Sequence, residues 1–372
     1  MLVSVTIMLL VVGATLTTFK NGVEVNDAGS QLGDTNQNLR AGTNTLIRDL
    51  MMAGRIIANG GVPVPNGVGA VAIARPGPPG SALTFSFVAD DDGTIMLPAI
   101  TTGFQLGPMI NASTTDIVTI LTVDEFQPVL TSVPTGTLPT AQQAVIAVDG
   151  SQLTLSNATP WLIGDAVNDT QPLQKGDIIL FKNANGMAMQ TITGMDATHI
   201  FFAQNDAVND WFHFNQRGTS LLGTIWCIKT TSACDTPPVT AAVQAMNFPT
   251  TALFRAMMIT YYVDNTTTPG TPRLTRAVDH FTPQALAGVV EDMDLTYDLV
   301  DTSGDNVAGM TSLPVTVNGV TYTSNMIKKV NLHIGVRAEQ ISKPTQTYVR
   351  NHISTAVGVR SLASVDRYDT TP

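Results

Sequence analysis

The residues that could do chemistry are few and scattered in this chain of 372 residues. None of its five histidines stands in the HxxxH or HExxH spacing that puts two zinc ligands on one helical face. The GxSxG turn that presents a nucleophilic serine in many hydrolases is absent as well. We therefore name no catalytic residue and expect no enzymatic activity. A Ser-His-Asp triad built from distant residues would leave no such motif, so a hydrolase remains the least favoured alternative.

One acidic run offers oxygen atoms of the kind that calcium prefers. Its candidate ligands lie around a glycine and are Asp301, Ser303, Asp305 and Asn306. Calcium takes six to eight oxygen ligands, and this run does not complete an EF-hand loop. It is either a weak calcium site or a solvated acidic turn between two strands, and no other cofactor is indicated.

The two cysteines, Cys227 and Cys234, have six residues between them. That separation is too long for a CxxC redox motif or a zinc half-site. We favour a local disulfide, which would indicate folding outside the cytoplasm. Two buried free thiols are the other interpretation.

The elements that position these residues begin with a long N-terminal helix, expected over residues 1–58. Its first part, 1–19, carries no charge and spans about 28 Å at helical rise, close to the hydrocarbon thickness of a bilayer. We expect this part to lie in a membrane or in the core of an assembly through Leu2, Val3, Val5, Ile7, Met8, Leu9, Leu10, Val11, Val12, Leu16 and Phe19.

The second part of the helix, 20–58, is amphipathic. Apolar residues recur there at intervals of seven, seven, four, three and four residues, which keeps them on one face of the helix. We expect this face to pack on the folded head through Leu32, Leu39, Leu46, Leu50, Ala53 and Ile57. Asp49 and its neighbours are expected mostly elsewhere around the helix, and glycines and prolines after Ile57 are expected to end it.

Two other interpretations of the apolar run are weaker. A cleaved secretory signal would carry a basic start and an A-x-A-type site, and the sequence has neither before the amphipathic part. A helix buried in a soluble protein would not explain why the uncharged run 1–19 continues into a stretch that is apolar on one face only.

The rest of the chain has the pattern of a β-rich head. A Gly/Pro-rich loop is expected at 59–82, and apolar or alternating runs bounded by turn residues then recur across 83–250 and 251–372. Strands are expected at 83–89 and 221–229, among others, and a short helix near 240–248. The predicted fold is α+β: a long helix on a mostly antiparallel sheet, with an inserted β-subdomain between about 100 and 250 as one possible arrangement.

Several of these stretches resemble type IV pilins and type II secretion pseudopilins. LVSVTIMLLVVGATLTTF resembles the apolar part of their N-terminal helix, and NLRAGTNTLIRDLMMAGR resembles its amphipathic part in minor pilins of the PilW kind. MITYYVDNTTTPGTPRLTR resembles that family's Tyr-Tyr strand followed by Leu-x-Arg, and LAGVVEDMDLTYDLVD resembles one of its later strands. The family's basic leader, cleavage-site glycine and helix glutamate match no position before Leu2, so none of them is carried over.

The resemblance implies a structural subunit of a pilus or pseudopilus. Such a subunit waits in the bacterial inner membrane as a single-pass protein and then joins an extracytoplasmic filament, where its N-terminal helix packs against those of other subunits. The assembly platform is a further implied partner, and a large head is typical of a tip, priming or adhesion role. The alternative is a membrane-anchored binding protein, an adhesin that does not polymerise.

The low share of charged residues suits an extracytoplasmic surface or a subunit that is buried among other subunits. Charged residues make up only 13% of the chain, and the net charge is −10. Lysine and arginine do not cluster, so the sequence gives no signal for binding nucleic acid by counterion release.

Overall fold

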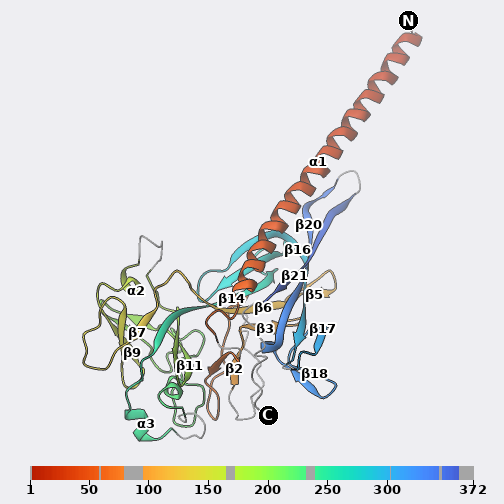
Figure 1. Cartoon of the computed structure of the whole chain (residues 1–372). Helices are drawn as coiled ribbons and strands as arrows, with labels where there is room; N and C mark the ends of the chain where they lie inside the picture. Colours follow the sequence, from red (N-terminus) through yellow and green to blue (C-terminus); the bar gives the residue numbers. More distant parts are fainter. Residues whose placement is uncertain are drawn as a thin grey trace.

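A single long helix projects from a β-rich head (Figure 1). The structure is a computed structural model that describes residues 2–57, 60–78, 95–164, 172–231, 239–301, 303–342 and 346–359. The helix, α1 (Leu2–Met52), is 51 residues long, which corresponds to about 77 Å at 1.5 Å per residue. The strand expected at 83–89 lies outside the described residues.

One large, mostly antiparallel sheet forms the head, and only one of its strand pairs, β7 with β8, is parallel among the described residues. The predicted α+β class with a long helix on a mostly antiparallel sheet is therefore confirmed. The strands of this sheet are β3 (Ile100–Gly103), β6 (Ile117–Val123), β7 (Leu130–Ser132), β8 (Gln143–Ile146), β9 (Gln152–Leu155), β10 (Ile178–Asn183), β11 (Gly186–Thr191), β12 (Gly194–Met195), β13 (His199–Phe201), β14 (Ala252–Asp264), β15 (Arg273–Val278), β16 (Gln284–Val300), β17 (Asn306–Met310), β20 (Ile327–Ser342) and β21 (Thr347–Gly358).

Smaller elements complete the head. Three two-stranded pairs are β1 (Val62–Val64) with β2 (Ile95–Leu97), β4 (Met109–Ile110) with β5 (Ser113–Thr114), and β18 (Val315–Val317) with β19 (Val320–Tyr322). The short helices are α2 (Pro160–Ile163), η1 (Ile225–Ile228), α3 (Ala241–Ala245) and η2 (Ser324–Met326).

Strand β14 joins the two halves of the head. Its first residues, Ala252–Ala256, pair with β10, whereas Ile259–Asp264 pair with β15, and β6 lies alongside Ala256–Tyr261. The half that bears α1 contains β3, β6, β15, β16, β20 and β21. The other half is a lobe at the end of the head away from the helix, where Figure 1 places β7, β9, β11 and α3.

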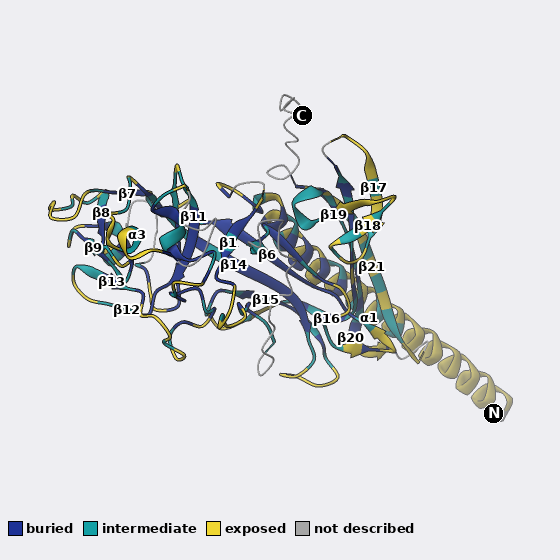
Figure 2. Cartoon of the chain, turned by 90° about the horizontal axis from the view of Figure 1, so that it is seen from below, coloured by how far each residue is buried: buried dark blue, intermediate teal, exposed yellow. Residues whose placement is uncertain are grey.

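Each half of the head has its own apolar core. The second half of α1 and the inner faces of β14, β16 and β20 enclose the larger core, which includes Leu46, Leu295 and Leu332. Side chains between Leu130 and Leu253, among them the fully buried Trp161, form the core of the lobe. Figure 2 shows the contrast between the buried strands and the exposed first half of α1.

The lobe is smaller than the subdomain expected from the sequence. Residues 100–123 belong to the helix-bearing half, because β3 and β6 pair with each other and β6 with β14, so the lobe begins at β7. The expected strand at 221–229 is also wrong, since η1 occupies its centre. Ile225 and Ile228 are buried three residues apart, a spacing that brings side chains to the same side of a 3₁₀ turn. The short helix expected near 240–248 is present as α3.

Candidate functional site

The first half of α1 is an apolar rod exposed along its whole length. Between Val3 and Phe19, ten large apolar side chains are exposed, with exposed fractions from 43% at Val12 to 73% at Val3. By length and composition this stretch can cross a membrane, and none of it is buried in the head. The exposed residues are Val3, Val5, Ile7, Met8, Leu9, Leu10, Val11, Val12, Leu16 and Phe19; Leu2 lies on the same helix.

The polar side chains of this rod are satisfied within the helix itself. The hydroxyls of Thr15, Thr17 and Thr18 donate to the carbonyls of Val12, Gly13 and Ala14 at 2.9, 2.8 and 2.9 Å. Moving a hydroxyl without a hydrogen-bond partner into an apolar medium costs free energy. Each of these three hydroxyls already has a partner in the helix, so the rod does not incur this cost for them. The rod is therefore suited to lipid or to the apolar side chains of other proteins.

The second half of α1 attaches the rod to the head. Leu39, Leu46, Leu50 and Ala53 are buried as predicted, with Leu46 and Leu50 fully so. Ile57 is buried as well, but in a separate apolar cluster that belongs to neither of the two cores above and includes residues of β1 and β10.

Leu32 was assigned wrongly to this contact: it is 40% exposed, because the covered stripe of the helix starts only at Thr35.

The helix also ends earlier than expected. It stops at Met52 because Gly54 turns the chain with a φ of 73° and donates its N–H to the carbonyl of Leu121 at 3.0 Å. Thr122 Oγ1 donates to the carbonyl of Met52 at 2.9 Å, so β6 satisfies the end of the helix.

A buried ion pair, missed by the sequence analysis, ties α1 to the sheet. Asp49 is fully buried rather than on the polar face of the helix. Its Oδ2 accepts hydrogen bonds from Tyr261 Oη and from Arg276 Nε, both at 2.7 Å. Tyr261 and Arg276 are direct cross-strand partners on β14 and β15. The helix therefore meets the sheet through one carboxylate held by two donors.

The electrostatics of this anchor are those of a charged pair in an apolar setting. Burial alone would lower the pKa of Arg276, but the hydrogen bond and charge of Asp49 outweigh it and hold that pKa above its ordinary value. Burial, and then the charge of Asp49, raises the pKa of Tyr261. Tyr261 therefore remains a neutral hydroxyl that donates its hydrogen bond to Asp49.

Two sequence signals could have indicated the anchor. Asp49 lies three residues after Leu46 and four before Ala53, so it shares their face. Tyr261 and Arg276 belong to the Tyr-Tyr and Leu-x-Arg motifs of the stretch Met258–Arg276. What the sequence could not show is that these motifs meet the helix.

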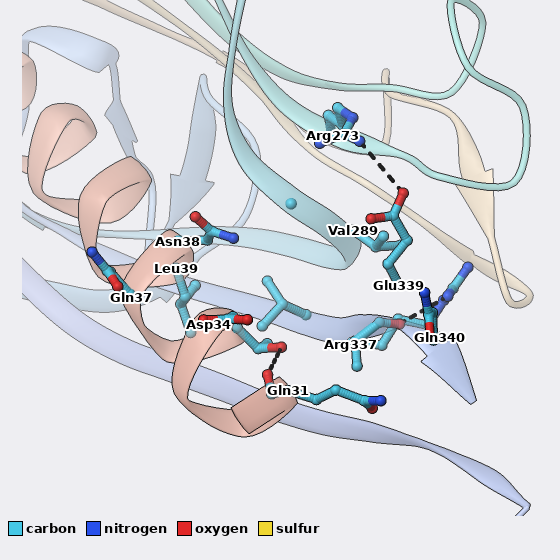
Figure 3. Close-up of a pocket in the computed structure, with 14 residues that line it drawn as sticks. Gln31, Asp34, Gln37, Asn38, Leu39, Arg273, Val289, Arg337, Glu339 and Gln340 are labelled. Atoms are coloured by element: carbon cyan, nitrogen blue, oxygen red, sulfur yellow. Dashed lines mark hydrogen bonds and ion pairs between the residues drawn. The ribbon is translucent and has the colours of Figure 1, made fainter. Parts of the chain in front are cut away.

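A polar hollow lies where the helix leaves the head (Figure 3). It measures about 520 Å³, and α1 between Gln31 and Leu39 faces β16 and β20 across it. Arg273 and Glu339 form an ion pair of 3.8 Å beside it. The amide and charged groups around it contrast with the apolar rod immediately before it in the chain.

The acidic turn near residue 301 is closed by its own hydrogen bonds. Asp301 is buried, and its Oδ1 accepts the N–H of Asp305 at 2.8 Å, whereas Ser303, Asp305 and Asn306 are exposed. Among the described residues, no group of three or more His, Cys, Asp or Glu side chains is placed to hold a metal ion. The hydrogen bonds account for the turn as a hairpin between β16 and β17, and calcium binding stays a prediction.

The cysteine pair is described only in part. Cys227 lies in η1, and Cys234 lies outside the described residues. The disulfide therefore stays a prediction.

Comparison of the chain with protein-family models, with curated proteins and with solved structures gives no match.

Proposed function

We propose that this protein is a structural subunit of a type IV pilus or a related pseudopilus, built into the filament through the first half of α1. The observation that carries the proposal is the continuity of one helix with two surroundings. Its first half is apolar and exposed, and its second half is fixed to an antiparallel sheet by an apolar stripe and a buried ion pair.

The exposed rod must be covered in the cell for energetic reasons. Burying one large apolar side chain contributes about 1.5–3 kcal/mol, so ten such side chains correspond to something on the order of 20 kcal/mol. That exceeds the net stability of a typical domain, about 5–15 kcal/mol. A membrane can cover the rod, and so can the apolar rods of other subunits. A filament subunit uses both surroundings in turn.

The shape of the molecule supports the same role. The rod projects from the head and lies free of it, which leaves its whole circumference for lateral packing (Figure 1). The head, by contrast, is large, as expected for a subunit at the outer surface, the tip or the priming complex of a filament. Its inner-membrane precursor would be a single-pass protein.

The test separates a polymerising subunit from an anchored adhesin. Filaments are sheared from cells that make the full chain, and the sheared and membrane fractions are probed with an antibody against the head. Leu9→Asp puts a charge in the middle of the rod, and Val68→Asp, at a head residue that is 91% exposed, is the matched control.

The proposal predicts that the wild-type protein and the Val68→Asp variant are found in sheared filaments and that Leu9→Asp is lost from them. If the wild-type protein stays entirely in the membrane fraction while filaments are released, it is an anchored protein that does not polymerise.

A further inference from the structure

The two halves of the head meet end to end along one edge of β14. Strand β10 of the lobe pairs with β14 as far as Ala256, and β15 of the helix-bearing half pairs with it from Ile259 onward. Strand β6 occupies the opposite edge of β14 across the same residues. Met257 and Met258 of β14 therefore lie in a short gap between the ends of β10 and β15, which we call the seam.

An acidic side chain lies on each side of the seam. Asp177 directly precedes β10, and Asp279 directly follows β15. Asp279 is bound to β14 in the seam itself: its Oδ1 accepts the N–H of Met258 at 2.7 Å, and its own N–H donates to the carbonyl of Met258 at 2.8 Å. The side chain of Asp177 is fully buried, and Asp279 is only 4% exposed. Two carboxyl groups thus approach each other from the two halves where little water reaches.

One arginine is shared between the carboxylates around the seam. Arg255 Nη2 lies 3.2 Å from Asp177 Oδ2, and Arg255 Nη1 lies 3.6 Å from Oδ2 of Asp124, which follows β6. Arg276, on β15, is taken up by the ion pair with α1. Among the described residues, a negative charge on Asp279 would therefore have no cation of its own.

A histidine is held against the same side chains. His280 Nδ1 lies 3.8 Å from Asp177 Oδ1, which is too long for a hydrogen bond. The imidazole contacts Trp211 and Phe281, with ring centroids 5.3 and 4.3 Å from its own. Gly176 lets the turn before β10 approach this ring, because a Cβ at that position would lie 2.4 Å from the ring Cγ. The histidine is therefore packed against the lobe side of the seam.

Four polar atoms of this cluster lack a hydrogen-bond partner among the described residues. They are Asp177 Oδ1, Arg255 Nε, Asp279 Oδ2 and His280 Nδ1, and all four are buried. Leaving such atoms buried costs free energy, and the cost is larger when the group is charged. The protonation state of the cluster therefore affects how firmly the seam is closed.

Asp279 favours the closed seam while it is protonated. Burial raises the pKa of Asp279 to about 8; the N–H of Met258 opposes this, and the charge of Asp177 adds to it. In an opened seam Asp279 would regain its ordinary pKa near 4. Opening therefore releases this proton between about pH 4 and 8, and the opening constant rises by up to tenfold per pH unit there. Burial also raises the pKa of Asp177, against the charge of Arg255, so this group acts in the same direction.

His280 acts in the opposite direction. Burial lowers the pKa of His280 below its ordinary value of 6.5, and the charge of Asp177 opposes this only in part. Below about pH 6.5 an opened seam therefore takes up a proton at His280 that the closed seam does not. This contribution favours opening in acid and offsets that of Asp279 there. The net loosening is expected mainly above pH 6.5.

We propose that the seam is a pH-sensitive joint between the two halves of the head, closed in neutral and mildly acidic solution and opened progressively in alkaline solution. Asp279 is its sensor, because it is bound to Met258 where the strands meet and faces Asp177 from the other half. Opening separates the ends of β10 and β15 while β14 stays continuous, so the lobe gains freedom relative to the helix-bearing half. The joint belongs to the head and is independent of the rod.

The test is hydrogen exchange of the full chain in detergent, read by mass spectrometry between pH 6 and 9. Each rate is corrected for the intrinsic exchange rate at that pH. Peptides that cover the start of β10 and the end of β15 report on the seam, and a peptide of β20 is the internal reference. Asp279→Asn keeps an oxygen for the N–H of Met258 but cannot ionise. Asp196→Asn is the matched control, since Asp196 also has a histidine neighbour, His199, but is 49% exposed in the lobe.

In the wild-type protein the corrected exchange of the seam peptides should rise about 10–30-fold from pH 6.5 to 9, while that of β20 stays constant. Asp279→Asn should remove most of this rise, and Asp196→Asn should keep it. His280→Gln should extend the rise to below pH 6.5, because the opposing group is gone. Equal pH profiles for the seam peptides and β20 in the wild-type protein would overturn the inference. So would a full wild-type rise in Asp279→Asn, which would place the sensor elsewhere.

Discussion

The buried pair between α1 and the sheet gives the sharpest test of how the helix is held. Asp49→Asn keeps the shape of the side chain and an acceptor for Tyr261 but removes the negative charge opposite Arg276. Asp49 is fully buried, and the side chain of Arg276 is 19% exposed. Loss of one partner from a buried pair costs about 3–5 kcal/mol, and the partial exposure of Arg276 reduces this to roughly 2–4 kcal/mol.

Arg48→Gln is the matched control. Arg48 approaches the other oxygen of Asp49 at 3.8 Å but is 69% exposed, so its loss should change stability by less than about 0.5 kcal/mol. Arg276→Gln, alone and combined with Asp49→Asn, completes a double-mutant cycle. The combined loss should be smaller than the sum of the two single losses, because each single variant leaves an unpaired buried group.

Hydrogen exchange of the full chain in detergent micelles, read by mass spectrometry, is the assay. Amides of α1 between residues 39 and 52 should exchange about 30–1,000-fold faster in Asp49→Asn than in the wild-type protein, which corresponds to 2–4 kcal/mol. If Asp49→Asn exchanges like the wild-type protein, or if Arg48→Gln speeds exchange as much, the buried pair does not hold the helix on the sheet.

Two further predictions concern packing and pH. Gly42→Ala should destabilise the helix–sheet contact by about 1–3 kcal/mol in urea unfolding, because the new Cβ would lie 2.9 Å from that of Ala287. In the control variant Gly33→Ala the new Cβ would have nothing within 4 Å, so this change should stabilise the protein by up to about 1 kcal/mol. Equal changes in stability for the two variants would contradict the close approach of Gly42 to Ala287. Burial raises the pKa of Asp279 to about 8 although its Oδ1 accepts the N–H of Met258. Because the unfolded chain loses this proton near pH 4 and the folded chain only near pH 8, the contribution of Asp279 to stability is full below pH 4 and is lost as pH rises to 8. Asp279→Asn should therefore gain melting temperature relative to the wild-type protein between pH 4 and 8, and a parallel pH profile would refute the raised pKa.

The apolar half of the helix–head contact was predictable, and its polar half was not. Spacing alone places Leu39, Leu46 and Leu50 on one face, since helical periodicity needs no knowledge of the partner. Asp49 was misplaced because its partner Arg276 is 227 residues away in the chain. A carboxylate within an apolar stripe indicates a buried pair only when the donor across the interface is known.

Local signals also failed where tertiary contacts decide the backbone. The run around Ile225 has the apolar alternation of a strand, but it forms η1, which packs against β11. Leu32 continues the apolar spacing beyond the point where the sheet covers the helix.

Photo-crosslinking from the rod shows what covers its apolar side chains in the cell. A photo-reactive amino acid replaces Val12, and another replaces Val68 on the head as the control. In cells, the probe at position 12 should crosslink to lipid before assembly and to the apolar helix of another subunit in filaments, and the probe at position 68 should do neither. Crosslinks from position 12 into the protein's own head would show that the rod is covered by its own chain and would contradict the account.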